Sequence, residues 1–563
     1  MADAQVSASI APTRVDLEER HGWGLFACPG LKFWTNGYGD VSNPAKLANK
    51  VRRMVGGPSL ENFLEVVRRL DGHFAFVIQG EGWVCAAVDR VRSIPLAYGK
   101  DEFGWRIDGQ AERLRRALGL TAENADELAA LALGMSGYTI DKSTLYPDVS
   151  VLGPGELIFF NGVSPPKRER YYCYRPWRQD KPVYEQAAAS KALAETLLAT
   201  IDEMMAAIGD RVLVVPLSAG RDSRVIVSAV RHLGYKNVKT FAYGRPGNHE
   251  AATSRYIAEK LGYEWKFVPT SISSMRGYYN SEDWKSYSLF ADTLQSTPFV
   301  QDHPQICSLK DQGFIPNDAV IANGNSGDYI SGAHIVPNTQ EVAHSQSDGQ
   351  RITSLLDALN EKHFSLWQSL RSSENCGRIN CLLKASIDRA GAKLGDPEDD
   401  YGIYEYAEFQ DRQCKYVIGG QRIYEYLEHE WRMPLWDNAL LDFFEMMPRE
   451  AKMDQRLYAD TLMQENWAGV WQDVPVNART IKPNWVRPLR FLTKMVHAPL
   501  GREAWHAFEK RYFGYWLELG GQSAIRPYSV VARDRRGARH GVAWLTEAHL
   551  ARHGLDYAGK PLA

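Results

Sequence analysis

Short apolar runs alternate with amphipathic segments through the middle of the chain. Four runs rich in Val, Ile, Phe and Ala have the composition of strands buried on both faces: 212–216, 238–244, 264–268 and 319–323. Between them, residues 224–233 and 249–261 carry apolar side chains at helical spacing, and a glycine follows each segment. Strands and helices that alternate at this spacing predict a doubly wound parallel sheet.

The first part of the chain shows a different pattern. Residues 74–78, 84–88 and 94–99 are short apolar runs, and Gly80-Glu81-Gly82 between the first two is a hairpin signal. We therefore expect a β-rich domain over residues 1–170, with an unrelated β-sandwich as the alternative. Residues 184–208 carry Ala, Leu and Met at helical spacing, which predicts a long helix before the sheet.

A small-residue loop, Ser218–Ser223, joins the first buried strand to its helix. Loop amides and a helix N-terminus that converge in this way favour an anion, and Gly220 allows close backbone approach. Asp222 is unusual here, because a carboxylate repels phosphate unless Mg²⁺ lies between them. We therefore expect Asp222 to be a metal ligand; a tight turn with a helix cap is the alternative.

This loop resembles the Ser-Gly-Gly-x-Asp-Ser signature of the N-type ATP pyrophosphatases, and the surrounding chain resembles the asparagine synthetase family. Ala219 stands at the first glycine of that signature. A second loop, Gly324-Asn325-Ser326-Gly327-Asp328, follows the fourth strand and resembles the family's Gly-Glu-Gly-Ser-Asp-Glu segment, which binds pyrophosphate and Mg²⁺. Two loops that each carry one carboxylate can hold one magnesium–phosphate unit from two sides.

The resemblance extends to the N-terminal domain. Asp71–Phe76 is similar to a strand of the glutaminase half of asparagine synthetases, Asp89–Tyr98 to its Arg-Asp pair and Pro-Leu-Tyr strand, and Leu152–Glu156 to its last turn. The family's nucleophile is a cysteine at position 2 whose free α-amine acts as the base, but residue 2 here is Ala2. We expect a glutaminase-like scaffold without glutaminase activity.

Three further segments bear on catalysis. Arg479–Pro483 resembles the family's Arg-x-x-Lys stretch, which implies that Lys482 neutralises phosphate charge, with a solvated surface lysine as the alternative. Asn325 occupies the position of a glutamate thought to assist deprotonation of ammonia, and asparagine cannot act as a base. His334 and Glu250 are candidate bases by residue type. Glu430–Asp437 resembles a structural element in which arginine and aspartate act as clamps, so we assign Arg432 and Asp437 structural roles.

The fold class predicted is α/β: an N-terminal Ntn-hydrolase-like α+β domain, then a doubly wound parallel-sheet ATP-pyrophosphatase domain. The predicted boundaries are 1–170 for the glutaminase-like domain, 171–210 for a linker and helix, 211–490 for the synthetase-like domain and 491–563 for a helical extension. Residues 340–397 are polar, and we expect either a lid beside the substrate or a surface helical pair.

The predicted site residues are, for ATP or pyrophosphate, Ser218, Ala219, Gly220, Asp222, Ser223, Tyr243, Gly244, Gly324, Ser326 and Gly327; for metal, Asp222 and Asp328; and for catalysis, Asp328 and Lys482.

The net charge and the cysteine content of the chain indicate which partners and which compartment to expect. The formal net charge is −2, which argues against binding to nucleic acid or membranes through overall charge. The basic and aromatic tail, 488–563, could form a nucleic-acid face, but the near-neutral charge of the chain favours a charged surface packed over the synthetase domain, and we expect no nucleic-acid or membrane partner. Seven cysteines, an odd number, predict no disulfide framework. With no secretory pattern at the start, we expect a cytoplasmic protein.

The resemblance implies an ATP-dependent ligase that adenylates a carboxylate, releases pyrophosphate and transfers ammonia or an amine to the acyl group. ATP and Mg²⁺ are the expected cofactors, a small carboxylate and ammonia or an amine are the expected substrates, and a homodimer is one candidate assembly. Three alternatives remain open: a genuine asparagine synthetase, an ATP pyrophosphatase that thiolates RNA, and a non-catalytic nucleotide-binding protein.

Overall fold

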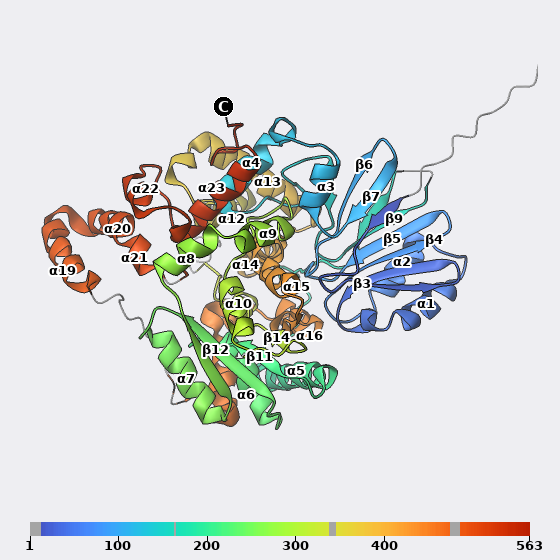
Figure 1. Ribbon diagram of the computed structural model, residues 1–563, viewed down its shortest axis with the longest axis horizontal. Coiled ribbons are helices and arrows are strands. Elements are labelled where there is room, and N and C mark those ends of the chain that lie inside the picture. Colours follow the sequence, from blue (N-terminus) through green and yellow to red (C-terminus); the bar gives the residue numbers. More distant parts are fainter. Residues whose placement is uncertain are drawn as a thin grey trace, which may run out of the picture. The chain divides into compact units, whose positions relative to one another are not determined.

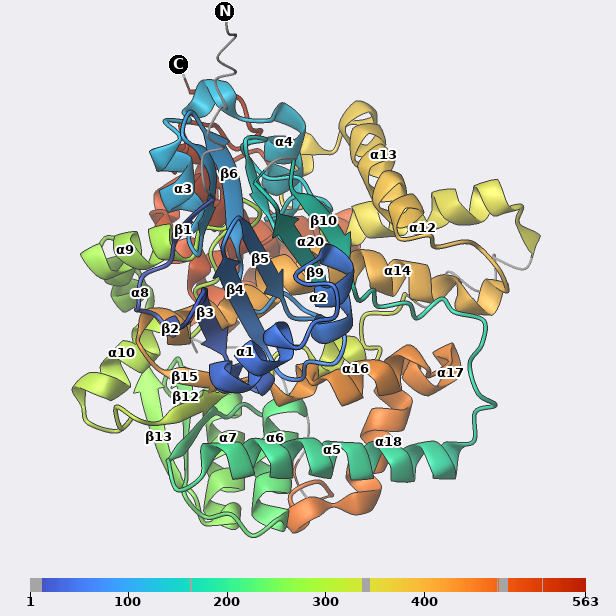
Figure 2. The ribbon, with the colours of Figure 1, turned by 90° about the vertical axis from the view of Figure 1, so that its right-hand side faces the viewer.

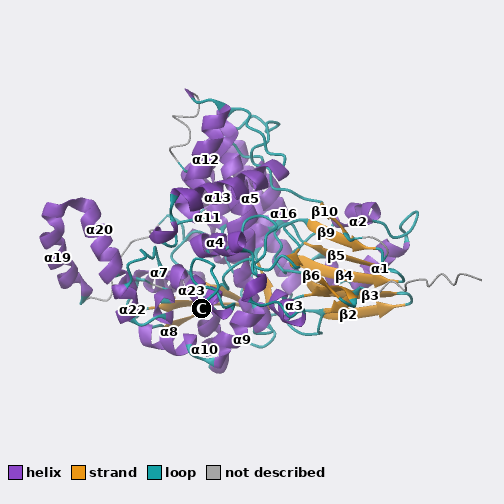
Figure 3. Cartoon of the chain, turned by 90° about the horizontal axis from the view of Figure 1, so that it is seen from above, coloured by secondary structure: helices purple, strands orange, loops and turns teal. Residues whose placement is uncertain are grey.

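A computed structural model describes residues 13–162, 165–336, 345–472, 474, 485–518 and 520–562. The chain divides into two compact units. The first comprises Met1–Asp126, Lys142–Cys173 and Phe290–Gln295, and the second Glu127–Asp141, Tyr174–Leu289 and Ser296–Ala563. In Figure 3 the strands of the first unit gather together, whereas helices predominate in the second.

Two sheets form the first unit (Figure 2). The six-stranded sheet is antiparallel, in the order β10 (Lys167–Arg170), β9 (Glu156–Phe160), β5 (Trp83–Val88), β4 (Phe74–Gly80), β3 (Leu31–Gly37) and β2 (Gly24–Cys28). The four-stranded sheet has the order β1 (Arg14–Asp16), β7 (Gly104–Asp108), β6 (Ala97–Asp101) and β8 (Val149–Val151). The predicted third strand, 94–99, begins at Ala97 instead, because Pro95 has no N–H to donate to a sheet.

The core of the first unit lies between the six-stranded sheet and two helices. Phe33 and Phe76 of the sheet pack in one apolar cluster with Phe63 of α2 (Leu60–Val67) and with α1 (Pro44–Arg52). Helix α3 (Ala111–Ala117) belongs to the same unit. Asp89 begins the segment that resembles the Arg-Asp pair of the glutaminase half. It is buried and accepts hydrogen bonds from the amides of Phe74, Val91 and Ser93. Its role in the structure is therefore to anchor the backbone around it.

The second unit contains one five-stranded, wholly parallel sheet (Figure 1). Its order is β13 (Glu264–Pro269), β12 (Val238–Gly244), β11 (Leu213–Pro216), β14 (Val320–Ala322) and β15 (Glu430–Arg432). The four predicted strands are present, and β15 adds the edge. Because the chain leaves β11 toward β12 and returns to its other side at β14, the order of winding reverses between β11 and β14. Ligands of such sheets bind at this position, beyond the carboxyl ends of the strands.

Helices connect and cover this sheet. Helix α6 (Asp222–His232) packs against α5 (Gln186–Ile208) and α7 (His249–Leu261). Helix α7 begins and ends as predicted, because the side chain of Asn248 caps its first turn and Gly262 adopts a left-handed conformation after its last. Helix α6 begins at Asp222, two residues before the predicted start, so the predicted metal ligand belongs to its first turn.

The described residues form many further helices. They are α4 (Glu127–Ser136), α8 (Ile272–Tyr279), α9 (Glu282–Phe290), α10 (His303–Asp311), α11 (Gly327–Ile330), α12 (Asp348–His363), α13 (Ser373–Arg389), α14 (Asp400–Glu408), the π-helix η7 (Phe409–Val417), α15 (Arg422–Tyr426), α16 (Asn438–Glu445), α17 (Arg449–Lys452), α18 (Arg456–Glu465), α19 (Val486–His497), α20 (Gly501–Tyr512), α21 (Gly514–Leu517), α22 (Tyr528–Arg533) and α23 (Gly541–Arg552). Within the described ranges, none of the helices has the length and apolar character needed to cross a membrane.

Candidate functional site

The loop after β11 is folded back on itself by its two serines. The amide of Ser218 donates to Oγ of Ser223 (3.0 Å), and the amide of Gly220 donates to Oγ of Ser218 (3.1 Å). Ala219 has a negative φ, so an alanine at this position of the signature causes no backbone strain. The loop thus keeps the compact form expected of an anion cradle at the start of α6.

The loop after β14 lies directly against the first loop, and two of its glycines make this possible. A Cβ on Gly324 would lie 2.6 Å from the amide nitrogen of Ser223, and one on Gly327 would lie 2.7 Å from the carboxyl carbon of Asp222. Ser326 is held in a left-handed conformation, with φ of 66°, and its hydroxyl donates to Gln413 of η7 (2.7 Å). The two predicted loops therefore form one surface, as the sequence suggested.

Asp222 is the central carboxylate of this surface. Its Oδ2 accepts a hydrogen bond from the amide of Asp328 (2.9 Å), whereas its Oδ1 is buried and has no hydrogen-bond partner among the described residues. Burial, aided by the nearby charge of Asp328, raises the pKa of Asp222 to about 8. A bound cation would satisfy the unpaired oxygen and favour its ionised form.

Asp328 and His334 form an ion pair beside it. His334 Nε2 lies 3.4 Å from Oδ2 of Asp328, and its Nδ1 contacts Glu408. Burial acts to lower the pKa of His334, but hydrogen bonds to these two carboxylates raise it to about 9. Burial alone would raise the pKa of Asp328, but the hydrogen bond from His334 holds this pKa below the usual range. The raised pKa favours the protonated form of His334, which makes it a poorer proton acceptor than its residue type suggests.

A cavity of about 430 Å³ opens beyond the carboxyl ends of β11, β12 and β14. Eight predicted site residues line it: Ser218, Gly220, Asp222, Ser223, Tyr243, Gly324, Ser326 and Asp328. Ala219, Gly244 and Gly327 are not among its lining residues, and Lys482 lies outside the described residues. Glu250 and Asn325 also line the cavity, so Glu250 stays a candidate base. The volume is typical of a small-molecule site.

Sequence reasoning missed two residues that support the first loop. The side chain of Arg224 is fully buried, donates to the carbonyl oxygen of Ala219 (2.8 Å) and lies over the Trp471 ring (5.2 Å). Gln455, which lines the cavity, accepts from Arg221 (2.9 Å) and donates to the hydroxyl of Ser331 (2.8 Å). Their partners lie on other elements, so the local sequence carries no signal of either role.

Arg432 and Asp437, which were predicted to have structural roles, lie at the end of β15 and directly before α16. Arg432 ends β15, where its guanidinium contacts Glu430 (3.3 Å) and donates to the carbonyl oxygen of Trp431 (2.8 Å). Asp437 caps α16 by accepting from the amide of Ala439 (2.9 Å). These contacts lie at the end of β15 and the start of α16, and the structural roles of both residues stay a prediction.

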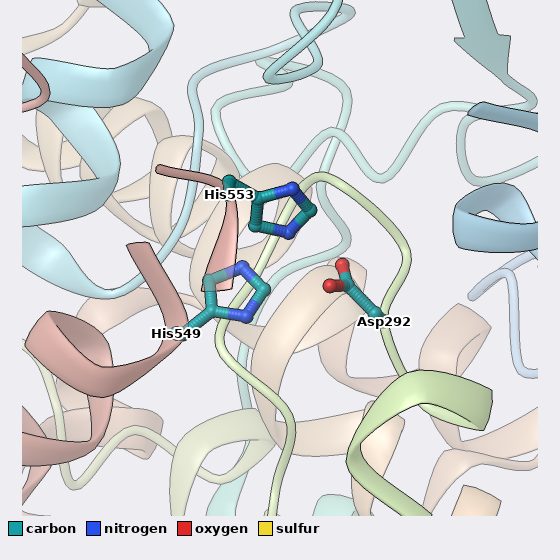
Figure 4. A group of neighbouring side chains, drawn as sticks. All are labelled: Asp292, His549 and His553. Carbon is teal, nitrogen blue, oxygen red and sulfur yellow. The ribbon is translucent and has the colours of Figure 1, made fainter. Parts of the chain in front are cut away.

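Two histidines near the C-terminus draw attention because histidines often bind metals. His549 on α23 and His553 one turn later are buried, with ring centroids 5.1 Å apart in an edge-to-face arrangement (Figure 4). Asp292, also labelled in Figure 4, belongs to the first unit. The edge-to-face contact packs the end of α23, and neither histidine lines the cavity beside Asp222.

Comparisons with known proteins find little. No protein-family model matches the chain, and no curated protein matches it. Among solved structures, glutamine phosphoribosylpyrophosphate amidotransferase from B. subtilis complexed with ADP and GMP is 14% identical, over 46% of this chain and 76% of that chain, with a TM-score of 0.19. A structure of the allosteric regulatory enzyme of purine biosynthesis is 12% identical over 46% and 74%, also with a TM-score of 0.19. Scores this low carry no conclusion about fold or activity.

Proposed function

We propose that this protein is an ATP-dependent amide synthase that forms AMP and pyrophosphate. It would adenylate a carboxylic acid and transfer ammonia or an amine to the activated acyl group. One observation carries the proposal: the loops after β11 and β14 meet where the sheet reverses its winding, with no room for a side chain at Gly324 or Gly327. Together they border one cavity large enough for part of a nucleotide.

The residues present fit a magnesium ion. Asp222 offers a buried oxygen that lacks a partner, and Asp328 offers a carboxylate whose side chain is 51% exposed beside it. Carboxylate oxygens are the protein ligands that Mg²⁺ prefers, together with phosphates of the substrate. When bound, the ion would offset the negative charge of the triphosphate. The fit supports the assignment of Asp222 and Asp328 as its ligands.

The loop residues would position the triphosphate. The N-terminus of α6, and those loop amides that do not already donate to Ser218 or Ser223, would suit its phosphates, and the nucleoside would bind beside Tyr243, which lines the cavity. An oxygen of the acid attacks the α-phosphorus, the bond to the β-phosphate breaks, and pyrophosphate leaves. The nitrogen of the amine then attacks the acyl carbon, the bond to AMP breaks, and the nitrogen loses one proton. Holding these groups in line would supply most of the rate enhancement.

The proton in the last step needs an acceptor. Asn325 cannot serve and the raised pKa of His334 disfavours it, so Glu250, which lines the cavity, is the base that we propose for the proton that the nitrogen loses. Lys482 remains a predicted source of positive charge. We propose that the nitrogen comes from free ammonia or an amine, not from glutamine.

The products of turnover test this proposal. Purified protein should be incubated with Mg²⁺, ATP, ammonium and a panel of carboxylic acids that includes aspartate, with ³¹P NMR as the readout. The account predicts AMP and pyrophosphate with at least one acid, none in Asp222→Asn, and no turnover when glutamine replaces ammonium. Release of ADP and orthophosphate would contradict it. Asparagine formed from aspartate would identify an asparagine synthetase, whereas ATP binding without turnover across the panel would indicate a non-catalytic protein.

A further inference from the structure

A second cavity, of about 620 Å³, lies among the C-terminal helices of the second unit. It is bordered by α20, α21, α22 and the start of α23, with the segment 534–540 along one side. None of the motifs that suggest nucleotide binding falls in this part of the chain. The cavity is larger than the one beside Asp222, and the proposed nucleotide site does not explain it.

Apolar side chains form much of its wall. The ring of Trp544 is fully buried, Tyr515 is nearly so, and Leu517 and Val531 are half-buried around them. Apolar surface of this kind favours a ligand with an apolar body, at about 25 cal/mol for each Å² removed from water.

Four cations also border the cavity: Lys510, Arg511, Arg535 and Arg539. Among the described residues, none of the four forms an ion pair. Arg511 donates to the carbonyl oxygen of Ala532 (3.0 Å), and Arg539 donates to the carbonyl oxygen of Lys362 and the hydroxyl of Ser365, all neutral partners. The side chains of Lys510 and Arg535 make no hydrogen bond within the described ranges. The site therefore carries uncompensated positive charge.

The two acidic residues that border the cavity, Glu518 and Asp534, already have other partners. The carboxylate of Glu518 accepts from the amides of Ser523 (2.7 Å) and Gly541 (3.0 Å), and Asp534 pairs with Arg536 (2.6 Å). Burial raises the pKa of Glu518, which weakens it further as a counter-ion. Burial is the main cause that lowers the pKa of Lys510, and the charge of Arg539 acts in the same direction. An anionic ligand would relieve this crowding of like charges.

A histidine in the cavity wall experiences the same positive charge. Burial lowers the pKa of His540 to about 4, and the charges of Arg539, Lys510 and Arg412 act in the same direction. An anion bound in the cavity would offset these charges.

We propose that this cavity binds a largely apolar organic acid. Lys510 and Arg535 would bind its anionic end, and the apolar wall around Trp544 would bind its body. This inference goes beyond the proposed function and does not rest on it.

Binding of a simple diacid tests the proposal. Octanedioate and 1,8-octanediol have the same chain length but differ in charge, so isothermal titration calorimetry with each separates anion recognition from apolar contact. We expect one octanedioate site per chain, and at least tenfold weaker binding of the diol. In Lys510→Gln/Arg535→Gln the affinity for octanedioate should fall by about tenfold or more, since each rim charge is worth up to about a fivefold factor.

Two further variants make the test specific. Lys191→Gln/Arg255→Gln changes the net charge equally at exposed positions on α5 and α7, and should bind octanedioate as the wild type does. Ala507→Phe, on α20, keeps every charge but fills part of the cavity, and should weaken octanedioate binding. Failure of the wild type to bind octanedioate at millimolar concentration, or equal binding by Lys510→Gln/Arg535→Gln, would overturn the proposal.

Magnesium–ATP binding, measured on the same proteins, separates this inference from the proposed function. Normal ATP binding by Lys510→Gln/Arg535→Gln with loss of the diacid would support an organic-acid site distinct from the nucleotide site. If the wild type bound the diacid but not ATP, the organic-acid site would stand and only the proposed synthase would be overturned.

Discussion

Replacing Gly324 by alanine tests whether the contact between the two loops holds the site together. A Cβ at this position would lie 2.6 Å from the amide nitrogen of Ser223 and 2.7 Å from the carbonyl carbon of Asp222. Both are backbone atoms, so no side chain can rotate away. Gly324 does not have a left-handed φ, so the clash alone produces the effect.

The size of the effect follows from these distances. Ordinary contact begins at 3.4 Å, so the loops would have to separate by about 0.8 Å. Overpacking of this kind costs about 1–3 kcal/mol of folding free energy. A displacement approaching 1 Å between catalytic groups lowers the rate by about 100-fold. We therefore expect Gly324→Ala to fold with a modest loss of stability and to lose most of its ATP-dependent activity.

Calorimetric titration with magnesium–ATP, together with denaturant unfolding, measures both effects. Gly377→Ala is the matched control, because Gly377 lies in α13 and a Cβ added there would point into open space. It should bind ATP normally and gain up to about 1 kcal/mol from the better helix propensity of alanine. Unchanged ATP binding and activity in Gly324→Ala would refute the idea that the two loops act as one surface.

Three further predictions concern single side chains. Asp222→Asn should lower the affinity for magnesium–ATP by about 100-fold in calorimetry, because a metal contact worth several kcal/mol is lost; equal affinity with and without Mg²⁺ in the wild type would contradict this. Lys452→Met should destabilise the fold by about 3–5 kcal/mol in urea unfolding. Nζ of Lys452 lies 2.6 Å from the fully buried carboxylate of Glu405, and the substitution leaves that carboxylate without its partner. The double variant Lys452→Met/Glu405→Leu should recover much of the loss. Burial lowers the pKa of His303 from 6.5 to about 4, so the folded state resists protonation and stability should fall by about 3 kcal/mol between pH 6.5 and pH 4; an equally steep fall in His303→Gln would show that another group is responsible.

The sequence predicted those elements whose signals are local. Strand β12 and helix α7 have the predicted bounds, because an apolar run ends at Gly244, Asn248 caps the helix and Gly262 stops it. The meeting of the two loops could also be anticipated, since both follow neighbouring parallel strands of one sheet. Strand β6 begins at Ala97, three residues after the predicted start, because Pro95 has no N–H to donate to a sheet.

Residues whose roles depend on distant partners could not be predicted. Arg224 has the spacing of a helix residue, yet the loop carbonyl of Ala219 and the Trp471 ring let its charged group be buried. His334 was a candidate base by type, but Glu408, 74 residues away, helps to keep it protonated. The cavity around Lys510 joins segments that share no motif, so only the folded chain reveals it.

Binding of magnesium–ATP to the wild type and to Asp222→Asn/Asp328→Asn tests the central claim most directly. Calorimetric titration in the presence of Mg²⁺ and, separately, of EDTA gives the number of sites and the dependence on metal. The account predicts one site per chain that requires Mg²⁺ and is lost in the double variant. Absence of binding to the wild type, or the same affinity in the double variant, would contradict it.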